Sequence, residues 1–438
     1  MKKIITLILF LVFSLLVLPL STQARMKFTP RINVSEEYND NIDLDRRDKE
    51  DDWITTIGPG FSFLMETNNL DVDLDYSLNL RYYKDNTDEN QNDFMDIQRA
   101  QGTATLFPGD PFTVVANANV STVIVDEREA TSDENSFVNR ALMYDLSINP
   151  NYNWRITSTL NASLGYLYHF VNYQQLGTWE STRGYENDDA PSEWQEHVVN
   201  FDLNKQFGPR TSCGISYAFT DHQYSDNNED EEDFQRHDIS ANLEQKIGSR
   251  LTLNLSGGVN FFDLDESGSD NGNVWSVTID YIVSDRLNMG LYYGRDYSVS
   301  VDRGISESDD ARATITYQDR LNVSLEGFAR KSKYGEEGIE FHNAADTEDQ
   351  SIGGLLQLSY PLGKRFTINF DTDYTYWEFK PDNEKVDRYA FAGSIDYNLL
   401  RNLDISLSYT YRINDSNMDE NDYRNNIAIL SIGYRLNP

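Results

Sequence analysis

The sequence predicts an all-β fold: a transmembrane, up-and-down antiparallel β-barrel of about 20 strands (18–20), with short periplasmic turns and long acidic extracellular loops. Three observations predict this fold class. Strand-length stretches have one apolar and one polar face, the connections between them alternate between short and long, and the chain starts with a stretch typical of exported proteins. After that start, no apolar run is long enough for a transmembrane helix, so crossing a membrane would require strands.

The stretch 399–413 has the clearest strand pattern. It reads LLRNLDISLSYTYRI, with apolar side chains at alternate positions from Leu403 to Ile413 and polar side chains between them, from Asn402 to Arg412. Successive side chains of a β-strand point to opposite faces, so this stretch predicts a strand with one apolar and one polar face. Its length matches a tilted membrane-crossing strand of roughly 9–11 residues.

Stretches of this kind follow one another along the chain. The predicted strands are 26–38, 52–66, 70–84, 91–107, 112–126, 136–150, 156–172, 193–207, 211–225, 233–247, 250–263, 273–284, 286–300, 308–319, 321–334, 348–362, 365–380, 385–399, 402–413 and 424–436. Strand 70–84 places Asp71, Asp73 and Asp75 on its polar face, and three successive aspartates favour a hydrated lumen over a dry core. A closed barrel pairs every strand edge, so the apolar faces can contact lipid.

The connections between strands are sorted by length. Short ones carry tight-turn residues, as in 108–111 and 363–364, and they alternate with longer ones rich in Asp, Glu, Asn and Ser, as in 39–51 and 173–192. This alternation is typical of an outer-membrane barrel, in which short turns face the periplasm and long loops face outside.

Arginine recurs in the short turns, one hairpin after another. These arginines are Arg210, Arg250, Arg286, Arg320, Arg365 and Arg401. One interpretation is a basic ring that contacts a periplasmic partner. The favoured interpretation is structural: each side chain extends to the lipid head groups beside an aromatic girdle.

Residues 1–24 have the pattern of a secretory signal peptide. Lys2 and Lys3 precede a nearly continuous apolar stretch, 4–20, and Thr22 and Ala24 provide small residues before a cleavage site. The alternative is a membrane anchor. We expect cleavage after Sec export, one barrel domain over 25–438, and location in a Gram-negative outer membrane.

Composition excludes several classes of protein. The chain has 72 Asp and Glu against 37 Lys and Arg, a net charge of −35, which argues against nucleic acid as a partner. The single cysteine, Cys213, excludes a disulfide framework. It shares the apolar face of its strand with Ile215 and Tyr217, so we expect it to face lipid or to serve as a small packing residue.

No catalytic motif is present. The histidines lie on separate strands or loops, without HExxH, a Cys/His cluster or GxSxG; they are His169, His197, His222, His237 and His342. The sequence therefore predicts no enzyme, no metal centre and no cofactor. The acidic segments 226–233 and 263–273 lack EF-hand spacing, and we expect solvated loops bridged loosely by divalent cations at the lipopolysaccharide surface.

The longest loop, 173–192, offers candidate sugar contacts. Trp179 and Tyr185 lie in it and Trp194 follows it, and aromatic rings beside polar groups make stacking platforms for sugars. The alternatives are a loop packed on itself inside the lumen and a place for Trp194 in the outer aromatic girdle.

The beginning of the barrel resembles a known family. Residues 29–42 read TPRINVSEEYNDNI, which contains Tyr38, Asp40 and Asn41 in a Tyr-x-Asp-Asn-Ile sequence, and the next strand carries a Pro-Gly pair in DWITTIGPGFSF, 52–63. These stretches resemble the outer-membrane beta-barrel porin families of the PEP-CTERM and exopolysaccharide type, whose loci often contain exopolysaccharide genes. The resemblance is specific over the first two strands and architectural beyond them.

The resemblance implies an outer-membrane channel for export of exopolysaccharide or passage of hydrophilic solutes. The alternatives are a general cation-preferring porin, which the acidic balance favours, and a non-conducting barrel that anchors surface polymer. Expected partners are membrane lipid, lipopolysaccharide, the polymer or solute, and periplasmic export components. Arg81, Arg330 and Arg412 share the inward face with many acids, so a neutral or cationic polymer fits better than an anionic one.

Overall fold

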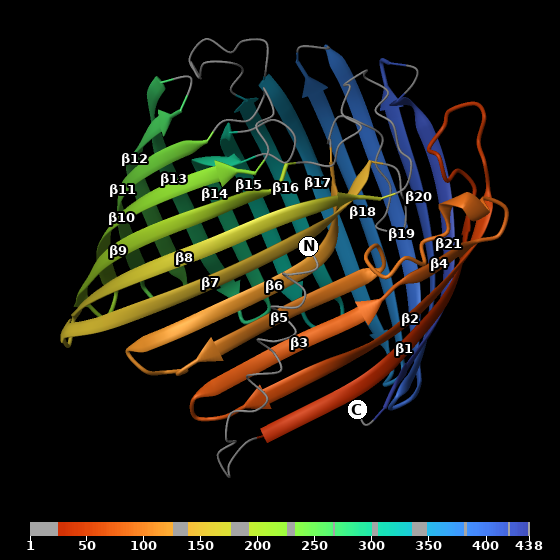
Figure 1. The fold of residues 1–438 in the computed structure, drawn as a ribbon, viewed down its shortest axis with the longest axis horizontal. Helices are drawn as coiled ribbons and strands as arrows, with labels where there is room; N and C mark the ends of the chain where they lie inside the picture. Colours follow the sequence, from red (N-terminus) through yellow and green to blue (C-terminus); the bar gives the residue numbers. More distant parts are fainter. Residues whose placement is uncertain are drawn as a thin grey trace.

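The chain forms one closed antiparallel β-barrel in the computed structural model (Figure 1). The structure describes residues 25–125, 139–176, 192–225, 233–265, 268–299, 305–334, 348–380, 383–418 and 421–436. Apart from β3 and β4, which both pair with β2, strands that follow one another in sequence pair with each other, and β1 pairs with both β2 and β21, which closes the barrel. The predicted all-β barrel is therefore confirmed. Among the described residues, no helix is long and apolar enough to cross a membrane.

The strands are β1 (Arg25–Asn39), β2 (Asp52–Glu66), β3 (Leu70–Leu78), β4 (Leu80–Tyr83), β5 (Gln98–Leu106), β6 (Phe112–Ile124), β7 (Arg140–Thr157), β8 (Leu160–Gln175), β9 (Trp194–Gly208), β10 (Thr211–Tyr224), β11 (Phe234–Ile247), β12 (Leu251–Leu264), β13 (Gly268–Ser284), β14 (Leu287–Val299), β15 (Ile305–Gln318), β16 (Asn322–Tyr334), β17 (Glu348–Leu362), β18 (Phe366–Phe379), β19 (Glu384–Leu400), β20 (Leu403–Ser416) and β21 (Tyr423–Arg435). A short 3₁₀ turn, Thr87–Glu89, follows β4.

β3 and β4 occupy one position in the barrel. Both pair with β2 in the same register, since Ser77 pairs with Gly60 and Leu80 pairs with Ile57. The interruption lies opposite Pro59, which has no N–H to donate to a neighbouring strand. The predicted strand 70–84 is thus interrupted, and the barrel has twenty strand positions, as the sequence predicts.

The boundaries of some predicted strands are wrong. The predicted strand 91–107 begins only at Gln98, because residues before it leave the sheet after one isolated bridge between Arg81 and Gln91. On the outer face, the Tyr144 hydroxyl donates to the Met95 carbonyl at 2.9 Å, which holds this excursion against β7.

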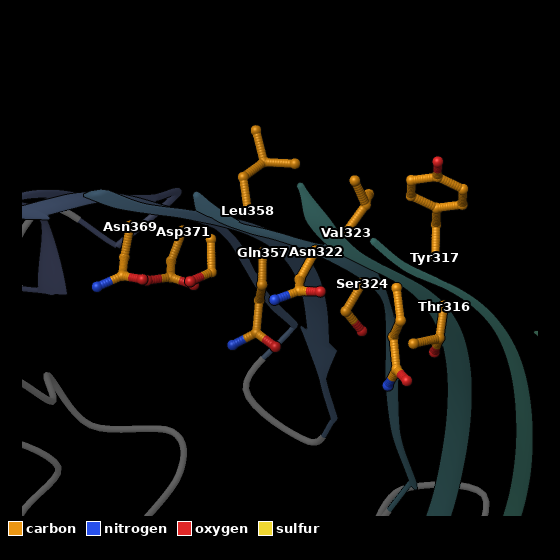
Figure 2. Close-up of a pocket in the computed structure, with 11 residues that line it drawn as sticks. Thr316, Tyr317, Asn322, Val323, Ser324, Gln357, Leu358, Asn369 and Asp371 are labelled. Carbon is orange, nitrogen blue, oxygen red and sulfur yellow. The ribbon is translucent and has the colours of Figure 1, made fainter. Parts of the chain in front are cut away.

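The two faces of the wall differ as the alternation predicts. In β20, Leu407 and Tyr409 are about half exposed on the outer face, whereas Ser406 and Ser408 face the lumen. Figure 2 shows the same division on β15–β18: Tyr317, Val323 and Leu358 point one way, and the polar side chains between them point the other way. Because paired residues on neighbouring strands point to the same face, the strand register extends this division into inward and outward side chains around the barrel.

Aromatic side chains on the outer face form two groups. One lies toward the short turns and includes the stacked pair Phe366 and Tyr397, with ring centroids 4.3 Å apart. The other lies toward the long connections and includes Tyr374 with Tyr389 and Tyr38 with Trp53. Phe366 and Tyr374 are both on β18, and at the usual strand rise and tilt their spacing spans about 20 Å of barrel height. Two aromatic girdles around an apolar band are typical of a membrane-spanning barrel.

Candidate functional site

The lumen is the candidate functional site, and the first long connection packs on its inner wall at the mouth. Between β1 and β2, Ile42 and Leu44 are buried against Ile54, Tyr83 and Tyr423. Ile54 and Tyr83 pair across β2 and β4 and face inward. This apolar cluster therefore fixes the connection 40–51 against the inner wall.

The motif residues from the start of the barrel join the first strand to the last. The Asp40 carboxylate accepts from the backbone N–H and the side-chain amide of Asn426, both at 2.6 Å. Asn41 donates to the Arg424 carbonyl at 3.1 Å, and the Asn425 amide donates to the Asn39 side chain and the Asn41 carbonyl, both at 2.7 Å. We call Asn39, Asp40, Asn41, Asn425 and Asn426 the closure cluster.

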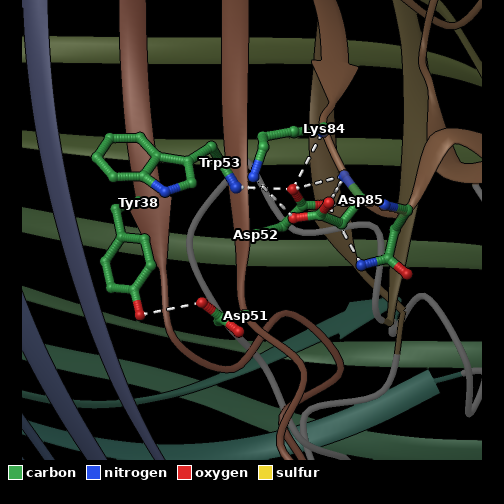
Figure 3. Close-up of polar contacts among 7 residues, drawn as sticks. Tyr38, Asp51, Asp52, Trp53, Lys84 and Asp85 are labelled. Atoms are coloured by element: carbon green, nitrogen blue, oxygen red, sulfur yellow. Dashed lines mark hydrogen bonds and ion pairs between the residues drawn. The ribbon is translucent and has the colours of Figure 1, made fainter.

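Tyr38, the other motif residue, faces outward. Its ring packs on Trp53 at 5.2 Å and its hydroxyl donates to Asp51 at 3.2 Å, as Figure 3 shows. The motif residues thus serve barrel closure and the outer wall, and none of them points at the open lumen.

Asp52 anchors a second connection at the mouth. Its carboxylate is fully buried and accepts from the backbone N–H groups of Trp53, Lys84, Asp85 and Asn86 and from the Asn86 amide (Figure 3). These bonds satisfy a buried charge that would otherwise destabilise the fold. They hold the segment after β4 to the start of β2.

A continuous row of rings crosses the inner wall from β8 to β14. Neighbouring ring centroids lie 4.8–6.2 Å apart. The row consists of His169, Trp194, His222, Phe234, Phe262 and Tyr297. Trp194 therefore lies on the inner wall and not in the outer girdle. The other two candidate sugar contacts, Trp179 and Tyr185, lie outside the described residues.

The loop end of the β14–β15 hairpin crosses the inner face of β12. β13 and β14 pair only as far as Trp275 and Arg295, but β14 and β15 remain paired to the ends of both strands. Tyr297 then packs on Phe262 with centroids 5.4 Å apart and is only 7% exposed. A Cβ on Gly272 would lie 2.2 Å from the Tyr297 hydroxyl oxygen, so this contact requires glycine there.

Ion pairs hold that hairpin in shape. Arg295 makes a bidentate contact with Asp309 at 2.8 and 2.7 Å and approaches Glu307 at 3.3 Å. The Tyr297 hydroxyl donates to Glu307. Bidentate arginine–carboxylate pairs are strong and geometrically specific, so this part of the mouth is ordered by charge as well as packing.

Toward the short turns, the inner wall is polar and open. β15–β18 line an open hollow of about 650 Å³. The polar residues that line it are Thr316, Gln318, Asn322, Ser324, Gln357, Ser359, Asn369 and Asp371. Figure 2 shows the labelled polar side chains projecting from one face of the wall, away from Tyr317, Val323 and Leu358.

The predicted turn arginines form contacts along the short-turn rim. Arg286 pairs with Asp319 in the next turn at 2.6 Å, and Arg250 donates to the Val283 carbonyl at 3.4 Å. The Arg320 guanidinium lies 5.1 Å from the Tyr360 ring centroid. The carbonyls of Arg210 and Arg365 also accept backbone N–H groups from the adjoining strands. These contacts suit the structural interpretation, and the role itself stays a prediction.

Two histidine–carboxylate pairs form across strands, where sequence order does not show them. His169 lies 2.8 Å from Asp145, and His222 lies 3.5 Å from Glu196. Register could have found the second pair, since His222 lies directly opposite Glu196. His197 and His237 contact outer-face tyrosines instead, and His342 lies outside the described residues. Within the described ranges, no group of three or more His, Cys, Asp or Glu side chains is placed to hold a metal ion.

The fold and the polar lumen define an outer-membrane-type β-barrel. Residues 344–436, which include β17 to β21, match the family model described as Putative beta-barrel porin 2. This match shows that the last strands are similar to those of a beta-barrel porin family. It covers the end of the chain opposite to the motif at Tyr38, yet the two ends meet at the β1–β21 pairing.

Solved structures share the architecture at low sequence identity. A mutant of the ferric enterobactin receptor PfeA from Pseudomonas aeruginosa aligns with a TM-score of 0.53 and 11% identity over 94% of this chain and 80% of the receptor. The FrpB iron transporter from Neisseria meningitidis aligns with a TM-score of 0.52 and 12% identity over 93% of this chain and 81% of the transporter. These likenesses concern the fold alone. The comparison with curated proteins gives no match.

Proposed function

We propose that this chain is a passive outer-membrane channel for hydrophilic solutes, with exopolysaccharide on its way out of the cell as the cargo. The observation that carries the proposal is the two-faced wall of a closed barrel. Its outer face is apolar between two aromatic groups, and its inner face is polar along the strands. The fold favours transport over catalysis.

The route of the chain to the membrane is part of the proposal. Residues 1–24 would be removed after Sec export, and the barrel would then insert with its short turns in the periplasm. Residues 1–24 and the acidic segment 226–232 lie outside the described residues. The signal-peptide pattern and the acidic composition support export and loose divalent-cation bridges to lipopolysaccharide. Periplasmic export components remain proposed partners.

A general cation-preferring porin is the second candidate. The inner wall includes Asp71, Asp73 and Asp75 on one strand, and among the described residues only Asp75 of these three is paired with an arginine, Arg31. Carboxylates on a lumen wall favour cations over anions. A barrel that only anchors surface polymer is the third class, and it would not conduct.

Two measurements separate these candidates. We expect the purified full chain to make liposomes permeable to uncharged oligosaccharides and to conduct ions in planar bilayers. Conductance without saccharide permeability would favour the general porin. A folded barrel with neither activity would contradict both channel proposals. Deletion of the gene should reduce surface polysaccharide if the channel exports it. Unchanged surface polysaccharide would contradict exopolysaccharide as the cargo.

A further inference from the structure

The hollow on β15–β18 combines polar groups that the protein itself leaves unused. In the part of the chain that the structure describes, seven of its side chains form no hydrogen bond with another protein group; they are Thr316, Gln318, Asn322, Ser324, Gln357, Ser359 and Asp371. Asn369 differs, because its amide donates to Ser394 and Asp396 at 3.0 and 2.7 Å. These seven side chains are therefore available to a ligand.

The hollow differs from the rest of the charged lumen. Elsewhere several inward charges are paired, as Arg31 with Asp75 and Arg312 with Asp310. Here amides and hydroxyls predominate, and Asp371 is the one carboxylate among the lining residues. Amide and hydroxyl groups both donate and accept, which matches the hydroxyls of a sugar chain. No lining aromatic faces inward, so contacts would be weak enough to release a moving solute.

The hollow lies close to the short turns. Gln318 and Asn322 flank the turn between β15 and β16, and Ser359 precedes the turn between β17 and β18. With the short turns in the periplasm, an outgoing chain would meet this surface first. We propose that the hollow is a saccharide subsite at the short-turn end of the lumen, which takes an uncharged hexose chain by hydrogen bonds. This inference rests on the proposed function and names its substrate class.

The test measures binding and passage separately. The full chain in lipid nanodiscs is titrated with an uncharged glucose hexamer and with a uronic acid hexamer by calorimetry. The double variant Asn322→Leu, Gln357→Leu removes two amides at similar volume. The matched control, Asn242→Leu with Asn254→Leu, changes two inward amides on β11 and β12 outside the hollow. Heat-modified gel mobility checks folding, and Ser324→Ala with Ser359→Ala is a milder pair should the leucines reduce folding.

We expect the glucose hexamer to bind, and the uronic acid hexamer to bind more weakly because Asp371 repels its carboxylates. The double variant should weaken glucose binding about fivefold to tenfold, and the control variant should change it little. Equal affinities in the variant, control and unmodified chain would overturn the inference, as would tighter uronic acid binding or no glucose binding. Liposome permeability to the hexamer reports on the proposed function. Permeability without binding would contradict only the saccharide subsite. Binding without permeability would contradict only the proposed channel.

Discussion

Asp40 and Asn426, 386 positions apart in the sequence, are joined by two hydrogen bonds of 2.6 Å. They lie where β1 and β21 meet, so they close the barrel at its loop end. Neighbouring Asn41 and Asn425 are fully buried and bonded across the same junction. The resemblance at the start of the chain and the family match at its end thus concern two sides of one contact.

Asn41→Ala should destabilise barrel closure. The substitution leaves the Asp45 N–H without its 2.9 Å partner and removes the donor to the Asp45 carbonyl, at a cost of about 1–3 kcal/mol in unfolding free energy. The Arg424 carbonyl loses the Asn41 amide but still accepts from Lys49. Urea unfolding in lipid vesicles measures this cost. Asn92→Ala, at an exposed position, is the control. Equal stability of the two variants would contradict a role for Asn41 in closure.

The connection 40–51 should become more stable as pH falls below neutral. Burial, followed by repulsion from Glu50, Asp45 and Glu89, raises the pKa of Asp43 to about 6 from its ordinary 3.8. A carboxyl with a raised pKa binds its proton more tightly in the folded state, so folding gains stability as pH falls from about 7 to about 4. The protection factor of this connection in nanodiscs, which is the intrinsic exchange rate at each pH divided by the observed rate, should rise over that range.

Asp43→Asn should raise the protection factor at pH 7.5 and remove most of its pH dependence. Asp88→Asn, which neutralises an exposed carboxylate next to Glu89, should leave that dependence in place. If both variants retain the full pH effect, the titrating group is not Asp43.

The barrel could be predicted from the sequence because strand faces and tight turns are determined by residues close together in the chain. The alternation of Leu407, Ser408 and Tyr409 fixes both faces of a strand, and short turns force neighbours in sequence to pair. The alternation along the strand also puts Trp194 on the same face as Glu196 and Asn200, opposite to Val199. The sequence-based prediction nevertheless kept a place in the outer aromatic girdle as an alternative for Trp194. The inward position of this tryptophan was therefore available from its strand.

Contacts between distant segments were not predictable in this way. Tyr297 shares the parity of the outward residues Leu291 and Tyr293, yet it packs on inward Phe262, because β14 leaves β13 after Arg295. Nothing local signals that separation. The unpaired polar set on β15–β18 likewise emerges only when several strands are aligned side by side.

Cys213 offers a test of membrane insertion without mutation. It lies on the outer face of β10 beside Ile215, which is 58% exposed. In lipid, we expect a charged, water-soluble thiol reagent to react at least about tenfold more slowly than a membrane-permeant maleimide, because a charged reagent is excluded from the apolar layer of the membrane. Mass spectrometry of the full chain in vesicles measures both rates. Fast reaction with the charged reagent would place β10 outside the apolar band.

Charge selectivity should depend on unpaired inward carboxylates. Asp73 and Asp371 face the lumen from β3 and β18 without a protein hydrogen bond or ion pair in the described structure. Asp73→Asn with Asp371→Asn should lower the potassium-to-chloride permeability ratio by about twofold, measured as a shift in reversal potential. Asp285→Asn removes one carboxylate in a short turn and should have less than half of this effect. An equal shift in both would assign selectivity to the rim.

Tyr297 should control the width of the mouth. Tyr297→Ala removes the ring that packs on Phe262 and the bond to Glu307, which should free the β14–β15 hairpin from the inner wall. We expect larger single-channel conductance and a loss of about 3–5 kcal/mol in unfolding free energy. Tyr297→Phe keeps the ring and loses only the hydroxyl, so its conductance should stay near that of the unmodified chain, at a cost of about 1–3 kcal/mol. Because packing on Phe262 is what holds the hairpin inward, equal conductance of the alanine and phenylalanine variants would mean that the hairpin does not limit the pore.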